Sequence, residues 1–251
     1  MKRIISTAAF VLGLGAAPIA ALDLGAMSDD ERAAFRAEVR AYLLDNPEVL
    51  MEAIGVLEQR QAAAEAALDT DLVAANTEAL FNDGYSYVGG NPDGDITLVE
   101  FLDYRCGYCK RAFAEVEELI ATDGNIRFIV KEFPILGEQS TLASQFAISV
   151  QQIHGDEVYK DVHNALMSMR SDVDPVSLAR LATALGLEPE PILEKMGSRE
   201  VAQVIEANHL LGQRLRISGT PSFVMETEML RGYLPLDGMR QYVDAIRAEN
   251  G

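Results

Sequence analysis

The chain contains two cysteines, and they stand three positions apart in the run Cys106-Gly107-Tyr108-Cys109. A structural disulfide between them would close a very short loop, which removes little entropy from the unfolded chain and stabilises a fold poorly. A structural zinc site needs further ligands, and the sequence offers neither a second cysteine pair nor a suitably spaced histidine pair. The spacing therefore favours a redox-active pair that exchanges disulfides with another molecule.

The residues on either side supply the elements that such a pair needs. The preceding run, 96–102, is mostly apolar and rich in β-branched residues, which predicts a buried strand. After the pair, apolar residues recur at helical spacing, and these are Ala112, Phe113, Val116, Leu119 and Ile120. Cys106 would then lie at a helix N-terminus, where unpaired N–H groups and the helix dipole stabilise a thiolate. We expect Cys106 to be the nucleophile and Cys109, one turn further in and shielded, to be the resolving thiol.

Composition limits the classes of protein to consider. Of the 251 residues, 49% are hydrophobic and 24% charged, which is enough for a sizeable core. The net charge is −18, from 21 Lys and Arg against 39 Asp and Glu, so nucleic acid is an unfavourable partner. The scattered His154, His163 and His209 are expected at surface or satisfied helix positions, and we expect no metal ligands and no cofactor.

The first 21 residues are typical of a bacterial signal peptide. Lys2 and Arg3 precede an apolar run from Ile4 to Leu14, and small residues follow up to Ala21. Cleavage after Ala21 leaves 230 residues (251 − 21) and a charge of −20 (−18 − 2). We therefore expect an exported, soluble, periplasmic protein, with an uncleaved membrane anchor or another secreted destination as alternatives.

The context of the cysteine pair resembles the thioredoxin-fold oxidoreductases of the DsbA superfamily. Glu100, six positions before the first cysteine, stands where these proteins carry a buried acid that assists proton transfer at the resolving thiol. Thr220-Pro221 matches the loop whose proline is cis and packs against the cysteines. The resemblance thus implies a catalytic set of Cys106, Cys109, Glu100, Thr220 and Pro221, although Glu100 could also be an ordinary strand residue.

The same resemblance implies an α/β fold for residues 85–251. The run 125–135 (NIRFIVKEFPI) looks like the next strand, and 223–225 and 229–231 look like the last two. A final helix would carry Met239, Tyr242, Val243 and Ile246. Residues 139–215 are helical in pattern throughout and would form the helical insertion that separates DsbA-like proteins from plain thioredoxin. A helix should start at Asp174-Pro175.

The dipeptide between the cysteines narrows the expected activity. Gly107-Tyr108 differs from the Pro-His of the strongly oxidising DsbA and resembles the Gly-Tyr of the DsbC isomerases, which also place Thr before the cis proline. This implies a disulfide isomerase or reductase, unless the dipeptide varies freely. The alternatives are a DsbA-like dithiol oxidase and a copper(I)-binding protein that uses both thiols as ligands. Methionines favour the copper reading, although they are more often core residues; these are Met167, Met169, Met225 and Met229.

Residues 22–84 have no counterpart in a thioredoxin fold, and we expect them to form a helical oligomerisation arm. Ser28 to Glu31 is a capping box, and Asn46-Pro47 should begin a second helix with Asn46 as its N-cap. That helix carries a row of positions at heptad spacing, called the apolar seam here: Leu50, Ile54, Leu57, Gln61, Ala64, Leu68, Asp71 and Ala75. The seam would be buried against copies of the chain, or against the chain's own catalytic domain.

Residues 42–50 and 58–61 resemble the N-terminal domain of the suppressor-of-copper-sensitivity (ScsC) proteins. The resemblance implies a homotrimer assembled through the arm and a connection with copper tolerance. It also implies two kinds of protein partner. These are misoxidised or reduced exported proteins, as substrates, and a membrane thiol reductase of the DsbD/ScsB type that keeps the cysteine pair reduced.

Overall fold

The computed structural model describes residues 25 and 27–250, so the signal peptide predicted for residues 1–21 lies outside the described residues. The chain divides into two compact units, one up to Gln59 and one from Arg60 onward. Helix α2 (Glu48–Ala75) crosses this boundary, so its two halves belong to different units. Among the described helices, none is both long and apolar enough to cross a membrane.

The first unit consists of α1 (Asp29–Asp45) and the first half of α2. The expected capping box begins α1: Ser28 Oγ accepts a hydrogen bond from the Glu31 N–H, and Glu31 accepts one from the Ser28 N–H at 2.8 Å. The expectation for Asn46 was wrong. Asn46 caps the C-terminus of α1, where its backbone N–H and its side chain both donate to the Tyr42 carbonyl, and α2 begins at Glu48.

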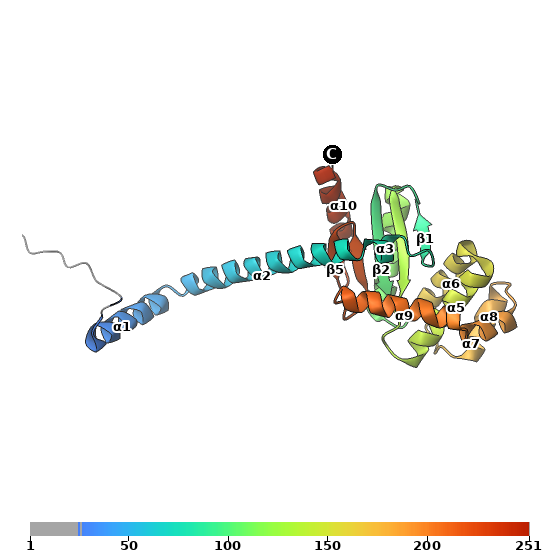
Figure 1. Ribbon diagram of the computed structural model, residues 1–251, viewed down its shortest axis with the longest axis horizontal. Helices are drawn as coiled ribbons and strands as arrows, with labels where there is room; N and C mark the ends of the chain where they lie inside the picture. The colour runs from blue at the N-terminus through green and yellow to red at the C-terminus, as the bar shows by residue number, and fades with distance from the viewer. Residues whose placement is uncertain (1–24, 26, 251) are drawn as a thin grey trace, which may run out of the picture. The chain divides into compact units, whose positions relative to one another are not determined.

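The second unit is built on a five-stranded mixed sheet, as expected for a thioredoxin fold (Figure 1). Its strands are β1 (Tyr87–Gly90), β2 (Ile96–Leu102), β3 (Ile126–Glu132), β4 (Ser222–Met225) and β5 (Glu228–Arg231). They lie in the order β1-β3-β2-β4-β5, with β2 and β3 parallel and the outer pairs antiparallel. The two central strands are buried along nearly their whole length, in agreement with their continuous apolar sequence.

Alternate residues of β2 belong to two different cores. Leu98 and Leu102 lie in the larger core, together with residues of α4 (Gly107–Asp123) and α10 (Leu236–Asn250). Val99 and Phe101 lie in the core on the opposite face of the sheet. This second core also contains residues from the end of α2, from α3 (Thr77–Phe81) and from α9 (Arg199–Arg214).

The helical insertion of the DsbA-like fold is present. It comprises α5 (Glu138–His154), α6 (Asp156–Ser168), α7 (Pro175–Ala184), α8 (Pro189–Met196) and α9. Asp174 caps α7 as expected, because its carboxylate accepts a hydrogen bond from the Ser177 N–H at 2.7 Å. Buried residues of α5 to α8 join the same core as the cysteine pair, so the insertion is continuous with the larger core.

The end of the segment that was expected to form the arm, from Asp69 to Asp83, packs on the sheet of the second unit, whereas residues 60–68 are exposed. Leu80 is 0% exposed in the core that contains Val99 and Phe101. The buried Lys131 ammonium lies 2.5 Å from the Asp83 carboxylate and donates to the carbonyl of Ala79. Without this segment, one apolar face of the sheet would lose part of its cover, which α9 shares, and Lys131 would lose its counter-ion.

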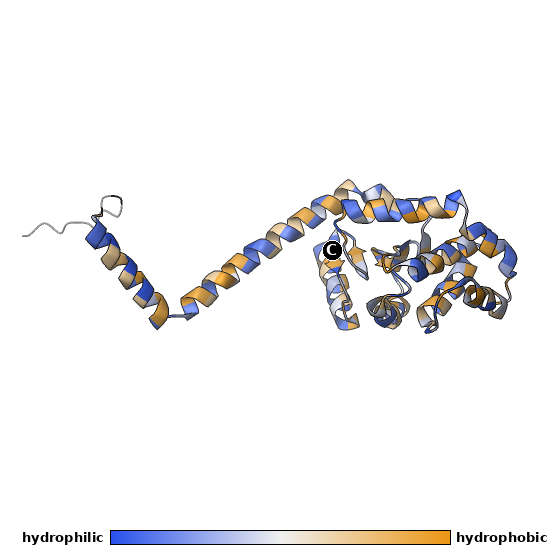
Figure 2. Ribbon diagram, turned by 90° about the horizontal axis from the view of Figure 1, so that it is seen from below, coloured by the Kyte–Doolittle hydropathy of each residue, from blue (hydrophilic) through white to orange (hydrophobic). Residues whose placement is uncertain are grey.

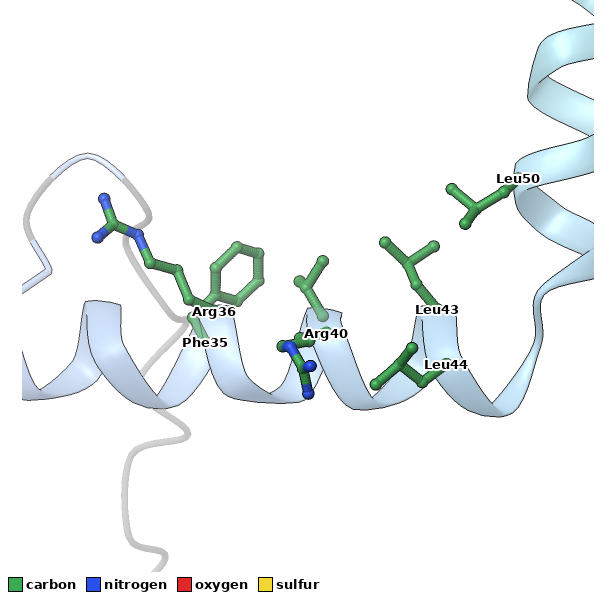
Figure 3. Close-up of a pocket in the computed structure, with 7 residues that line it drawn as sticks. Phe35, Arg36, Arg40, Leu43, Leu44 and Leu50 are labelled. Carbon is green, nitrogen blue, oxygen red and sulfur yellow. The ribbon is translucent and has the colours of Figure 1, made fainter.

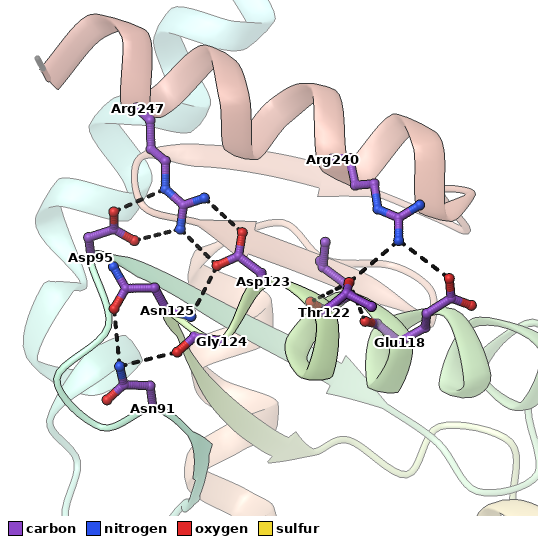
Figure 4. Close-up of polar contacts among 10 residues, drawn as sticks. Asn91, Asp95, Glu118, Thr122, Asp123, Gly124, Asn125, Arg240 and Arg247 are labelled. Atoms are coloured by element: carbon purple, nitrogen blue, oxygen red, sulfur yellow. Dashed lines mark hydrogen bonds and ion pairs between the residues drawn. The ribbon is translucent and has the colours of Figure 1, made fainter.

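The last helix is fixed by two arginines (Figure 4). Arg247 makes paired hydrogen bonds to Asp95, which precedes β2, and to Asp123, the last residue of α4, at 2.7 to 3.0 Å. Arg240 donates to Glu118 of α4 at 3.3 Å. Bidentate pairs of this kind combine charge with a fixed geometry, so α10 holds the far end of the helix that begins at Cys106.

Candidate active site

The turn between β2 and α4 places Cys106 at the N-cap position of α4. Asp103, which is completely buried, holds this turn: one carboxylate oxygen accepts from the Arg105 N–H at 2.7 Å. The other accepts from the N–H groups of Ile135 and Leu136, at 2.8 and 3.0 Å. The sequence analysis missed Asp103, although an Asp directly after a strand and before a helix is a common turn residue.

The two cysteines are free thiols in the structure, and Cys106 is the more reactive by its surroundings. A hydrogen bond from Cys109 lowers the pKa of Cys106 to about 5 against the opposing effect of burial. A side-chain hydrogen bond with Thr220 and the backbone N–H groups of Cys109 and Tyr108 contribute to the same lowering. At neutral pH, Cys106 is therefore mostly a thiolate, which is the nucleophilic form.

Cys109 has the opposite environment, three residues along the same helix. It is 0% exposed, whereas Cys106 is 8% exposed. Burial raises the pKa of Cys109, and its hydrogen bond to Cys106 and the charge of Glu100 raise it further. Cys109 thus holds its proton while Cys106 does not, which is the asymmetry that a nucleophile and a resolving thiol require.

Glu100 lies in the middle of β2, on the face that carries the larger core, and is 2% exposed. Burial raises its pKa to about 8, the charge of Glu117 raises it as well, and Lys160 opposes them. Among the described residues, its Oε1 atom has no hydrogen-bond partner. The structure therefore places a buried carboxyl, able to exchange a proton near neutral pH, where its charge acts on both cysteines.

The Thr220–Pro221 peptide bond is cis, as the resemblance implied. Strand pairing brings this bond to the cysteines, because Ser222, the first residue of β4, pairs with Phe101 near the end of β2. Cys106 Sγ lies 3.1 Å from the Thr220 carbonyl oxygen, to which it donates a hydrogen bond when it is protonated. The loop and the cysteine pair, more than 100 residues apart in the sequence, thus form one site.

A buried polar network connects the active-site turn to the helical insertion. Glu132 accepts hydrogen bonds from the hydroxyls of Tyr104, Tyr159 and Ser144, each at 2.7 Å. Tyr104 stands two residues before Cys106, and its hydroxyl also lies 3.1 Å from His163 Nδ1. Burial raises the pKa of Glu132 to about 7. This network was not predicted from the sequence, because its members come from β3, α5, α6 and the turn after β2.

The remaining sequence candidates occupy ordinary structural positions. His163 is buried in the network just described, His209 contacts the Pro134 carbonyl, and His154 is exposed. Met167 and Met225 are core residues. Within the described part of the chain, no group of three or more His, Cys, Asp or Glu residues could hold a metal ion. Tyr108, between the cysteines, is 61% exposed.

Two family descriptions match the chain. Residues 97–244, more than half of it, match the DSBA-like thioredoxin domain, and residues 31–64 match the Copper resistance protein ScsC N-terminal domain. A thioredoxin-like oxidoreductase from Silicibacter pomeroyi DSS-3 is 39% identical, with a TM-score of 0.64 over 68% of this chain and 97% of that one. ScsC of Proteus mirabilis in a transitional conformation is 28% identical, with a TM-score of 0.65 over 90% of this chain and 100% of that one.

Curated relatives match more than half of the chain. Disulfide bond formation protein D of Bacillus subtilis is 24% identical over 165 residues, which are 62% of this chain and 74% of that protein. The Na(+)/H(+) antiporter NhaA 3 of Salinispora tropica is 26% identical over 141 residues, 55% of this chain. The chain spans only 21% of the length of that antiporter.

Proposed function

Because this chain belongs to the DSBA-like thioredoxin family of thiol–disulfide oxidoreductases and carries an ScsC N-terminal domain, we propose that it is a periplasmic protein disulfide isomerase. The observation that carries the proposal is the asymmetry of the two thiols. The pKa of Cys106 is lowered to about 5 beside the cis Thr220–Pro221 loop, while burial raises the pKa of Cys109. Isomerisation needs an attacking thiolate, and release from a mixed disulfide that fails to rearrange needs a second thiol that stays protonated until it is required.

In the first step, the Cys106 thiolate attacks one sulfur of a wrong disulfide. A mixed disulfide forms between Cys106 and the substrate, and the other substrate sulfur leaves as a thiolate. A different substrate thiolate then attacks the substrate sulfur of the mixed disulfide and releases Cys106 as a thiolate. The substrate has exchanged one disulfide for another, with no net oxidation or reduction.

Cys109 provides the escape when no substrate thiolate attacks. It passes its proton to the Glu100 carboxylate and attacks Cys106, which releases the substrate as a thiolate and leaves a Cys106–Cys109 disulfide. The substrate gains two electrons and the enzyme loses two. A raised pKa of about 8 suits Glu100 to this transfer, because a carboxylate with an ordinary pKa would be a weak base toward a buried thiol. A membrane thiol reductase of the DsbD/ScsB type would return the pair to its reduced form.

The N-terminal unit supports assembly into a homo-oligomer, which we propose to be a trimer by similarity to the ScsC proteins. No α1 side chain, along a helix that the structure describes in full, is buried. Phe35 and Leu43 of α1 and Leu50 of α2 point into one apolar groove within this unit (Figure 3). Figure 2 shows hydrophobic residues along both helices of the unit. Second copies of the chain would cover these side chains, and several active sites would then face one substrate.

A trapping experiment tests the chemistry. Cys109→Ala should accumulate mixed disulfides with an unfolded, disulfide-containing protein, because only the escape step is lost. Cys106→Ala should accumulate none, and alkylation as a function of pH should show a higher pKa for Cys106 in the Cys109→Ala variant than in the wild type, because the hydrogen bond from Cys109 is lost. The Cys109→Ala variant keeps Cys106 as its single cysteine, so each adduct can be assigned by mass spectrometry. Absence of adducts in the Cys109→Ala variant would overturn the assigned roles.

A further inference from the structure

Basic residues flank the cysteine pair in a strongly acidic chain. Residues 104–114 contain three basic residues and no acidic one, although the whole chain carries 39 acidic residues against 21 basic ones. A fourth basic residue joins them from the connection between α6 and α7 of the helical insertion. We call these four residues the basic rim: Arg105, Lys110, Arg111 and Arg170.

One side of the rim is held by backbone carbonyls. Arg105 Nη1 donates to the Ser171 carbonyl at 2.9 Å, and the Lys110 ammonium donates to the Met169 carbonyl. Neutral carbonyls orient these cations without cancelling their charge. Burial lowers the pKa of Lys110, and the charges of Arg105 and Arg170 lower it as well, so the three cations lie within electrostatic reach of one another. The carboxylate on this side is Asp172, which is 80% exposed and 3.7 Å from Arg105.

The other side of the rim rests on an aromatic platform. The Arg111 guanidinium lies 4.5 Å from the centre of the Tyr233 ring, and that ring lies 6.2 Å from the exposed ring of Tyr108. Glu115, the acid on this side, accepts from the Tyr233 hydroxyl at 2.6 Å and from the Leu236 N–H at 2.8 Å, so its carboxylate is turned toward these two donors. The exposed Arg111 charge is therefore presented beside Tyr108, two residues from Cys106.

We propose that the basic rim binds acidic residues on either side of the substrate cysteine, so that the protein selects disulfides in acidic segments of polypeptide. The inference rests on the proposed function, because attack by Cys106 requires the substrate chain to pass across these residues. Carboxylates of the substrate would find counter-charges at the rim, and the exposed Tyr108 ring would contact its apolar side chains. With a net charge of −18, the chain as a whole repels acidic segments, so attraction limited to the rim also orients them.

The test compares three peptides that carry the same internal disulfide and differ only in two flanking residues, which are Glu, Gln or Lys. With the mature chain at low ionic strength, we expect reduction rates in the order Glu, Gln, Lys, with about a tenfold ratio between Glu and Lys. At about 1 M salt, where the screening length is about 3 Å, the ratio should approach one. Arg111→Gln and Arg170→Gln should each lower the ratio about two- to threefold, and the double variant Arg111→Glu, Arg170→Glu should reverse the order.

The matched control is Arg199→Gln, which removes one exposed positive charge at the start of α9, a helix that packs on α5 and β3. It should leave the Glu to Lys ratio unchanged. Alkylation of Cys106 as a function of pH measures its pKa in each variant. A change in that pKa would alter the reduction rates of all three peptides by the same factor, whereas a loss of recognition would alter their ratio. Equal wild-type rates for the three peptides would overturn the rim and leave the proposed function standing. No reaction with any peptide would overturn both.

Discussion

The two units of the described chain differ in how far their apolar side chains are exposed. In the first unit, α1 buries none of its residues, and Leu50, Ile54 and Leu57 of α2 remain about half exposed. In the second unit, residues of the same kind are enclosed on both faces of the sheet, as Leu98 on one face and Val99 on the other show at 0% exposure. The second unit therefore accounts for its own stability, whereas the first unit needs a further surface to cover it. Catalysis and assembly should be separable for this reason.

The largest effect is expected from moving the start of the chain across the boundary between the two units. A chain that begins at residue 60 should unfold with the same midpoint as the second unit of the full chain. A chain that begins at residue 85 should lose about 5 kcal/mol or more, because Val73 and Leu80 leave the sheet and Lys131 loses Asp83. Urea denaturation followed by circular dichroism measures both. Equal midpoints for the two truncated chains would mean that residues 60–84 belong to the arm.

Single substitutions compare a buried leucine of the second unit with an exposed leucine of the first unit. Leu80→Ala should lower the free energy of unfolding of the second unit by about 2 to 5 kcal/mol, because Leu80 is completely buried. Leu57→Ala removes the same atoms from a side chain that is 55% exposed. It should change the free energy of unfolding of the second unit by less than about 0.5 kcal/mol. Chemical denaturation of both variants in the full chain is the measurement. A similar loss in both variants would show that the arm stabilises the second unit.

The buried network gives the second unit a pH dependence. The pKa of Glu132 is raised from 4.5 to about 7, so between these values the unfolded chain releases a proton that the folded chain retains. This carboxyl therefore contributes stability below pH 4.5 that is lost as the pH rises through 7, up to about 3 kcal/mol. In Glu132→Gln that loss should be absent, so the stability deficit of the variant should shrink from pH 4.5 to pH 8. Parallel stability curves for variant and wild type would contradict the assignment.

The smallest effect on the second unit is expected from changes in the arm. Ile54→Asp with Leu57→Asp places charge on the exposed seam and should leave the unfolding of the second unit unchanged within about 0.5 kcal/mol. Assembly should nevertheless be lost, as measured by sedimentation velocity, since a buried charge without a partner opposes association. The double variant Glu52→Ala, Glu58→Ala in the same helix is the control. Unchanged assembly in the Asp variant would show that the seam is not the contact.

Much of the second unit could be predicted from the sequence because its signals are local. The apolar run of β2, the helical spacing after the cysteines and the Asp174-Pro175 start of α7 each lie within one element. The family resemblance supplied the site, since the strand pairing of Ser222 with Phe101 is not written in either segment alone.

The parts that were missed depend on contacts between distant segments. The whole of α2 was expected to belong to the oligomerisation arm, yet the end of the helix packs on the sheet through Val73 and through Asp69, which pairs with Arg231 from β5 at 2.6 Å. These residues lie outside the apolar seam, so the heptad pattern did not predict that another side of α2 contacts the sheet. Tyr233 was missed similarly, because its role depends on Arg111 and Glu115 of a helix more than 100 residues earlier.

The most direct test of the account is the reactivation of a scrambled multi-disulfide protein by the mature chain, compared with the chain that begins at residue 60. We predict that the mature chain restores activity, that the shortened chain does not, and that both reduce a small model disulfide at similar rates. That outcome would place the chemistry in the second unit and the isomerase activity in the assembly. Equal reactivation by the two chains, or rapid oxidation of a reduced substrate with no reactivation by either, would contradict it.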